Sequence, residues 1–305
     1  MKAIKINKFG ELEELNMMKK DMAEKYELNI RDLRPVYSFL QVATFLPRKN
    51  VLIVNLGKYK VVISKNEAYF LIHHPNLLDY VKDFLKINSH KLKEKDIDRI
   101  FYLYILEKIL DVKYQEIKNK NQDMMSEANS VLEKIRQSFH EKDLEPLIRI
   151  KKRVLRNESK LTEILSAVKE VLDDDENFEE LISLGGNVEV NSLEAESVLE
   201  NFLEELEDEI GNLNQVKETL DHGQEIIDLT LSIRRTNIGR IDLFATVSSL
   251  VMGILAVIVG LYGVNLKNHL ENSEIAFYVL AALLVLFIIL SAVFAVWYLR
   301  KKKVI

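Results

Sequence analysis

The stretch LFATVSSLVMGILAVIVGLYGVNL, residues 243–266, contains no charged side chain. A second uncharged stretch, IAFYVLAALLVLFIILSAVFAVWYL, covers residues 275–299. Each exceeds the roughly 20 apolar residues that a helix needs to cross a bilayer, and a helix satisfies its own backbone groups in lipid. We therefore predict an integral, multi-pass membrane protein with two transmembrane helices, 243–266 and 275–299, joined by an outer loop at 267–274.

The short loop allows only an antiparallel hairpin, so both chain ends lie on one side of the membrane. Arg240 precedes the first stretch, and a basic tail at 300–305 follows the second. Positive charge flanking membrane helices favours the cytosolic side or its equivalent, such as the mitochondrial matrix. The soluble bulk of the chain is predicted to lie there.

One face of the first stretch is small or polar, whereas the others are bulky and apolar. Two interpretations stay open: small residues let helices pack closely in lipid, and a small, polar stripe can line a water-filled path. The second stretch has no such face and is interpreted as an outer, lipid-facing helix. The residues of the stripe are Gly239, Asp242, Thr246, Ser249, Gly253, Ala256 and Gly260.

The composition of the 305 residues narrows the function classes. A net charge of −5 disfavours nucleic acid as a partner, and the absence of cysteine excludes disulfides and Cys-based zinc sites. The sequence shows neither a glycine-rich phosphate loop nor a nucleophile with a nearby base, so we predict that the chain is not an enzyme. The chain contains only 4 prolines and 10 glycines. Because these residues interrupt helices, their scarcity indicates long helices.

The part before the membrane stretches divides into three predicted segments. Residues 1–90 form an α/β subdomain, because runs rich in β-branched and aromatic residues there predict a small antiparallel sheet. Residues 91–190 form a helical subdomain, and 191–242 form a stalk helix that starts near Ser192 and continues without proline into the first membrane stretch. The apolar stripe of the stalk predicts packing against copies of itself. The three predicted strands are 51–54, 60–63 and 68–72.

The fold class is therefore a mostly α membrane protein: an N-terminal α/β soluble domain, a long stalk helix and two C-terminal transmembrane helices. Helices are also expected from about Asp96 and after Asp143.

Two acidic segments are candidates for binding a hard cation through oxygen ligands. Between residues 194 and 209 there are eight acids and no Lys or Arg; a solvated helix face is the plain alternative. The run 173–176 ends a predicted helix, where the helix dipole disfavours acids; a solvent loop is its alternative. The candidate ligands are Asp173, Asp174, Asp175, Glu176, Glu204 and Asp208.

Arg235, just before the first membrane stretch, also has two interpretations. It anchors the helix at the membrane surface, or it forms a ring at the inner entrance of a pore and repels cations.

The segment Tyr262-Gly263-Val264-Asn265 resembles the Tyr-Gly-Met-Asn signature of the CorA superfamily of magnesium channels. Three further segments resemble motifs of its eukaryotic branch, the mitochondrial and vacuolar magnesium channels, and occur in the same order. They are Arg31-Asp32-Leu33-Arg34, residues 48–63, and Leu172-Asp173-Asp174-Asp175-Glu176. The resemblance covers the chain from about residue 30 to its end.

The resemblance implies a homopentamer in which the first membrane helix lines the pore, so that its stripe is the pore wall. It implies that Asn265 forms a carboxamide ring at the outer mouth, and Mg²⁺, which gives up its water reluctantly, would pass this ring hydrated. Glu271 and Glu274 would concentrate cations there. Bound Mg²⁺ on the acidic stalk would regulate opening. The family resemblance also implies the mitochondrial inner membrane as the location.

Val264 departs from the signature, which has methionine at this position. Gly-Val-Asn variants occur in zinc-transporting and other divergent branches, so another divalent cation (Zn²⁺, Ni²⁺ or Co²⁺) is the alternative cargo. A non-conducting oligomeric membrane scaffold is the alternative from a different class. It would tolerate Thr246→Leu or Gly253→Leu on the stripe, whereas a pore would not.

Overall fold

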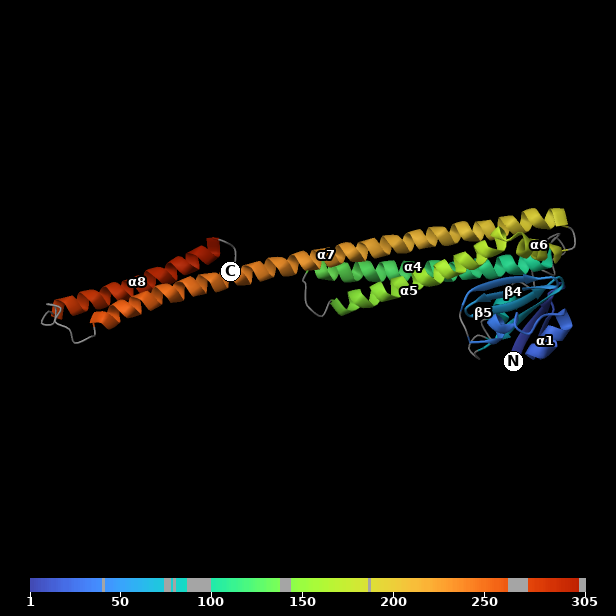
Figure 1. Cartoon of the computed structure of the whole chain (residues 1–305), viewed down its shortest axis with the longest axis horizontal. Helices are drawn as coiled ribbons and strands as arrows, with labels where there is room; N and C mark the ends of the chain where they lie inside the picture. The colour runs from blue at the N-terminus through green and yellow to red at the C-terminus, as the bar shows by residue number, and fades with distance from the viewer. Residues whose placement is uncertain are drawn as a thin grey trace. The chain divides into compact units, whose positions relative to one another are not determined.

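The computed structural model describes residues 1–39, 42–73, 78, 81–86, 100–137, 144–185, 188–262 and 274–301. These residues form two compact units, Met1–Gly223 and Gln224–Ile305, and the ribbon of each is drawn in Figure 1.

The first unit begins with a six-stranded antiparallel sheet in the order β2-β1-β6-β5-β4-β3. The three predicted strands are confirmed as β4, β5 and β6, whereas β1, β2 and β3 were not predicted. β1 lies inside the sheet because it pairs with β6 as well as with β2. The strands are β1 (Lys2–Asn7), β2 (Leu12–Asn16), β3 (Thr44–Arg48), β4 (Val51–Leu56), β5 (Tyr59–Ser64) and β6 (Glu67–Ile72).

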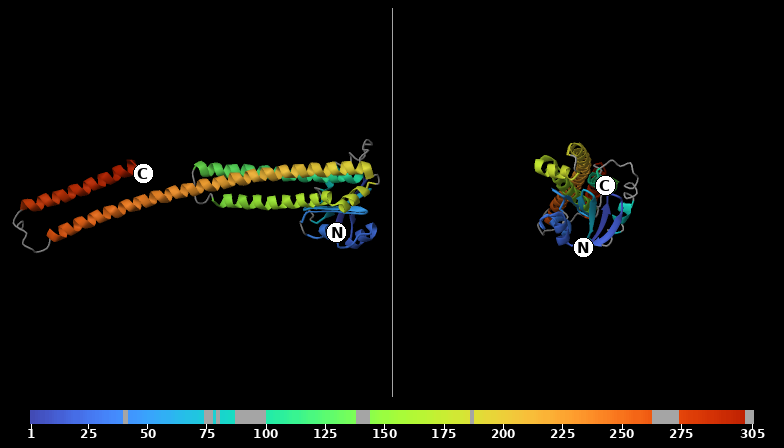
Figure 2. Two further views of the ribbon diagram at one scale, coloured as in Figure 1. Left: turned by 45° about the horizontal axis from the view of Figure 1, so that its top comes forward. Right: turned by 90° about the vertical axis from the view of Figure 1, so that its right-hand side faces the viewer.

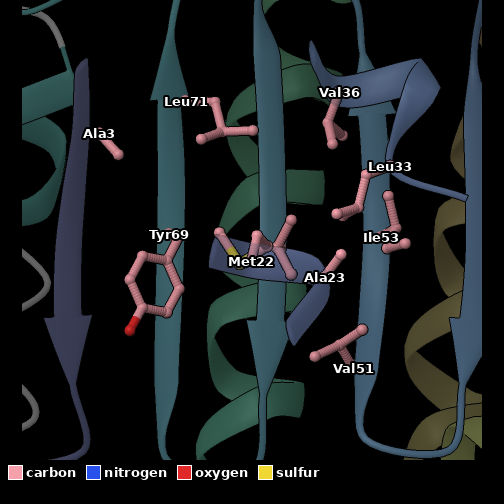
Figure 3. Close-up of a cluster of buried hydrophobic side chains, with 10 residues drawn as sticks. Ala3, Met22, Ala23, Leu33, Val36, Val51, Ile53, Tyr69 and Leu71 are labelled. Atoms are coloured by element: carbon pink, nitrogen blue, oxygen red, sulfur yellow. The ribbon is translucent and has the colours of Figure 1, made fainter. Parts of the chain in front are cut away.

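Both faces of the sheet are covered, which explains why β4 and β5 are buried along their whole length. Helices α1 (Lys19–Tyr26) and α2 (Arg34–Tyr37) cover one face, where Met22 and Leu33 pack against Ile53 and Leu71 (Figure 3). Helices α4 and α5 contact the sheet through β5, β6 and β3. A strand covered on both sides has a continuous apolar run rather than an alternating one.

The helical part of the first unit contains α4 (Phe101–Gln137), α5 (Leu144–Asp173), α6 (Asp175–Ser183) and the first part of α7 (Val188–Tyr262). In Figures 1 and 2, α4, α5 and this part of α7 lie alongside one another. The start of a helix after Asp143 is confirmed. The helix expected near Asp96 begins, among the described residues, at Phe101, and the stalk helix begins at Val188, four residues before the predicted Ser192.

A buried polar layer crosses this helix bundle. Asn121 of α4 donates its side-chain amide to Glu209 Oε2 of α7 at 2.7 Å and to Glu209 O at 3.2 Å. Asn157 of α5 donates to Asn121 Oδ1 at 2.7 Å, and Lys120 donates to Asn157 Oδ1. Asn121, Asn157 and Glu209 are each at most 4% exposed. The layer therefore satisfies polar groups that would otherwise be costly to bury.

The acidic run 173–176 lies at a junction between two helices. α5 ends at Asp173, as predicted, but a new helix, α6, starts at Asp175. Asp174 is the N-cap residue of α6, and its Oδ1 accepts hydrogen bonds from the backbone N–H groups of Glu176 at 3.0 Å and Asn177 at 3.3 Å. The argument that acids are misplaced here is therefore wrong, because negative charge is favourable at a helix N-terminus.

The second unit contains the rest of α7 and α8 (Glu274–Lys301). Gly239 does not interrupt α7, and neither do Gly211 and Gly223 before it. Within the described residues, one helix is long and apolar enough to cross a membrane, the Ser192–Leu261 part of α7, and α8 contributes the shorter apolar segment Ala281–Leu290. The mostly helical fold with an N-terminal sheet and a long helix is thus confirmed, and crossing by α8 stays a prediction.

Candidate functional site: the α7 stripe and the acidic cleft

The seven residues of the predicted pore stripe lie on one helix, α7. Their spacing alternates between three and four residues from Gly239 to Gly260, which keeps them on one face of a helix. All seven are exposed in the single chain. A Cβ placed at Gly239, Gly253 or Gly260 would meet no atom within 4 Å, so the single chain leaves this face open.

The side chain of one stripe residue, Thr246, is bonded to the backbone of another, Asp242. Thr246 Oγ1 donates a hydrogen bond to the backbone oxygen of Asp242 at 2.9 Å. Its oxygen keeps its acceptor capacity, because a hydroxyl has one proton and two lone pairs. Arg235 is also exposed on α7, one turn before the stripe. Its predicted role at an inner entrance stays a prediction.

The predicted selectivity residues Gly263, Val264 and Asn265 lie outside the described residues, as does Glu271. Glu274 is the first residue of α8. Their roles at an outer mouth stay predictions.

Glu204 and Asp208 line a cleft of about 630 Å³ between α4 and α7. The opposite wall contributes Glu107 and Asp111 of α4, which sequence reasoning missed. Their spacing of four residues on a predicted helix was the available signal. Lys108 Nζ pairs with both, at 3.0 Å and 2.7 Å. The further carboxylates that line the cleft are Glu194 and Glu205.

One carboxylate of the cleft, Glu205, has a raised pKa. Burial raises the pKa of Glu205, the nearby Asp111 raises it further, and Lys118 opposes both. However, no group of three or more described His, Asp or Glu residues is arranged to hold a metal ion. Asp173, Asp174, Asp175 and Glu176 likewise form no such group in the described part of the chain, so the regulatory role of all six predicted ligands stays a prediction.

The fold agrees over its whole length with a solved membrane-transporter structure. "The complete structure of CorA magnesium transporter from Methanocaldococcus jannaschii" matches with a TM-score of 0.71 at 14% sequence identity, covering 100% of this chain and 99% of that chain. The full-length CmaX protein matches with a TM-score of 0.59 at 12% identity, covering 99% and 97%. These likenesses show a CorA-like fold.

Residues 2–235 match the family described as "Magnesium transporter MRS2-like", and the chain belongs to this family. The chloroplastic magnesium transporter MRS2-A of Oryza sativa subsp. indica is 22% identical over 330 residues, covering 99% of this chain and 69% of that protein. The mitochondrial inner membrane magnesium transporter mrs2 of Schizosaccharomyces pombe is 23% identical over 273 residues, covering 86% and 65%. The resemblance to the eukaryotic branch of the CorA superfamily is confirmed, and a family of transporters agrees with the prediction that the chain is not an enzyme.

Proposed function

We propose that this chain transports Mg²⁺ across a membrane, through a path lined by the stripe of α7. The family match over residues 2–235 carries the proposal. The open, small and polar face of α7 supports the location of the path, because glycines and hydroxyls leave room for a hydrated ion.

The transporter is proposed to be a homo-oligomer, and the family resemblance suggests a pentamer. A path along the stripe needs several copies, because one helix exposes the stripe without enclosing it. In this arrangement α8 is the second membrane helix, both termini lie on the cytosolic or matrix side, and Asn265 forms the ring that selects hydrated Mg²⁺. Arg235 stands at the inner entrance, and Glu271 and Glu274 at the outer one.

The names of the relatives do not agree on one cellular membrane. Some are named for the mitochondrial inner membrane and others for the chloroplast. We propose only that the chain is an integral, multi-pass membrane protein of the MRS2-like type.

Val264 favours a second candidate function, transport of another divalent cation such as Zn²⁺, Ni²⁺ or Co²⁺. Valine is shorter than methionine and branched at Cβ, which restricts its side chain. It would change how the residues beside it hold Asn265.

Ion flux into liposomes decides between the candidates. The purified full chain is reconstituted with separate dyes for Mg²⁺ and Zn²⁺ inside the liposomes, and wild type is compared with Asn265→Ala. Mg²⁺ flux in wild type that changes in the variant supports the proposal. Zn²⁺ flux without Mg²⁺ flux supports the second candidate, and the absence of Mg²⁺ flux above empty liposomes refutes the proposed Mg²⁺ transport. Equal flux in wild type and variant removes Asn265 as the selecting residue.

A further inference from the structure

A second, smaller cavity of about 230 Å³ lies in the first unit, where the sheet meets α4 and α5. It is lined by four lysines from three elements. Lys58 comes from the β4–β5 turn, Lys113 and Lys120 from α4, and Lys160 from α5. Sequence reasoning did not single them out, because they are separated by up to about a hundred residues along the chain.

The fold fixes how these lysines come together. Leu56 pairs with Tyr59, so β4 and β5 are joined by a two-residue turn, and Gly57 adopts a φ of 81° that suits its first position. The turn brings Lys58 to α4, where its Nζ lies 3.0 Å from Glu116 Oε2. Lys120 is held by its hydrogen bond to Asn157, which also lines the cavity.

The positive charge of the cavity is only partly balanced. Four lysines face two glutamates, Glu116 and Glu163, in the lining. Glu116 Oε2 serves both Lys58 and the half-buried Lys113, whose Nζ is 3.8 Å away. Neither Lys120 nor Lys160 forms an ion pair with any residue in the described part of the chain.

Two of these lysines, Lys113 and Lys120, have lowered pKa values. Burial lowers the pKa of Lys113, and the neighbouring lysines lower it further against the pull of Glu116. Burial also lowers the pKa of Lys120, and Lys160 is the largest charge acting in the same direction. Lys120 and Lys160 are exposed, whereas the Lys113 side chain is only 14% exposed. The cost of gathering like charges therefore falls mainly on Lys113, and a bound counter-charge would relieve it.

We propose that this cavity binds a small, soluble, phosphate-bearing anion, with Lys113, Lys120 and Lys160 supplying the positive charge. Lysine ammonium groups bind phosphate as point charges. The volume accommodates a small ligand: at roughly 30 Å³ per water molecule it holds about seven or eight waters, the space of one or two phosphate groups. This is less than the pocket of a drug-sized ligand, which starts at about 300 Å³.

Calorimetric titration of the full chain in detergent tests the proposal. The buffer contains neither Mg²⁺ nor chelator, and the titrants are inorganic pyrophosphate and orthophosphate. The pocket variant is Lys120→Gln/Lys160→Gln. The control is Lys134→Gln/Lys152→Gln. These two lysines are exposed, as Lys120 and Lys160 are, and lie on the same two helices, but they are outside the lining.

Wild type is expected to bind pyrophosphate saturably. The pocket variant should bind at least about tenfold more weakly, and the control within about twofold of wild type. A third variant, Glu163→Gln, removes a negative charge from the lining, while its amide oxygen can still accept the hydrogen bond that Ala43 N donates at 2.7 Å. It should bind several-fold more tightly, a gain that misfolding cannot imitate.

Two results would overturn the proposal. The first is the absence of saturable binding of either titrant to wild type. The second is an equal loss of affinity in the pocket variant and the control. Such a result would mean that pyrophosphate responds to the net charge of the protein and not to this cavity. The site is independent of transport, so neither result bears on the proposed movement of Mg²⁺.

Discussion

Removing Asn121 should destabilise the protein more than removing its partner Glu209. In Glu209→Ala, the Asn121 amide loses a 2.7 Å bond to a carboxylate but keeps the Glu209 backbone oxygen at 3.2 Å. A hydrogen bond to a charged group contributes about 1.5–3 kcal/mol, so we expect a cost of about 2 kcal/mol.

In Asn121→Leu, two groups lose their partner at once. Asn157 loses the acceptor of its amide, and the buried Glu209 carboxylate keeps only Asn212 Nδ2, at 3.3 Å. Losing a hydrogen bond to a charged group costs about 1.5–3 kcal/mol, and leaving the Asn157 amide unsatisfied adds about 1–3 kcal/mol. The double variant Asn121→Leu/Glu209→Ala removes the stranded charge and should be more stable than Asn121→Leu alone.

Thermal unfolding of the full chain in detergent, followed by far-ultraviolet circular dichroism at fixed protein concentration, measures these differences. At roughly 2–4 °C per kcal/mol, Glu209→Ala should lower Tm by about 4–8 °C, and Asn121→Leu by more. Asn119 lies near Asn121 on the same helix but is exposed. The variant Asn119→Leu is therefore the control and should leave Tm nearly unchanged. If Asn121→Leu costs less than Glu209→Ala, or if the two changes are additive, the buried layer does not exist as described.

Three other changes have expected outcomes. Burial raises the pKa of Glu67, but hydrogen bonds from Lys25, Lys5 and Tyr69 outweigh it and lower the pKa to about 2. The stabilisation by the ionised Glu67 is therefore complete above pH about 4.5 and is lost as the pH falls toward 2. Glu67→Gln should flatten the acid side of a curve of Tm against pH. Gly211→Ala, in open helix, should raise stability by about 0.5–1 kcal/mol in denaturant unfolding, and a loss would contradict the geometry. Gly253→Leu should lower liposome Mg²⁺ flux about tenfold or more by blocking the path, while Ile254→Leu on another face keeps it; normal flux in Gly253→Leu would favour the scaffold.

The long helices were predictable because apolar periodicity and the scarcity of proline are local signals. α5, α7 and the strands β4, β5 and β6 follow from such signals. β1 was missed because Lys2 and Lys5 interrupt its apolar residues, and β2 because its LEELN segment has two adjacent acids and no buried residue.

The acidic run shows where local reasoning fails. Asp173 to Glu176 were correctly placed at the end of α5, yet nothing in the run itself revealed that a second helix begins two residues later. One capping side chain, Asp174, reverses the electrostatic argument.

Contacts between segments that are distant along the chain could not be predicted from the sequence. Arg48 pairs with Asp32 at 3.3 Å and with Glu180 of α6 at 3.5 Å. Two of the segments that carried the family resemblance, 31–34 and 48–63, are therefore bound to each other. The stripe of α7 could be predicted from spacing alone, but the lysine cavity needed the fold.

The buried layer of Asn121, Asn157 and Glu209 also limits how the helices can move. Sliding α7 by one helical turn, about 5.4 Å, would carry the Glu209 carboxylate away from its donors and into a core built from side chains such as Leu206 and Leu213. The layer therefore favours a single register of α7 relative to α4 and α5. Within this unit these hydrogen bonds tie α7 to α4, and α4 to α5, at one level of the bundle.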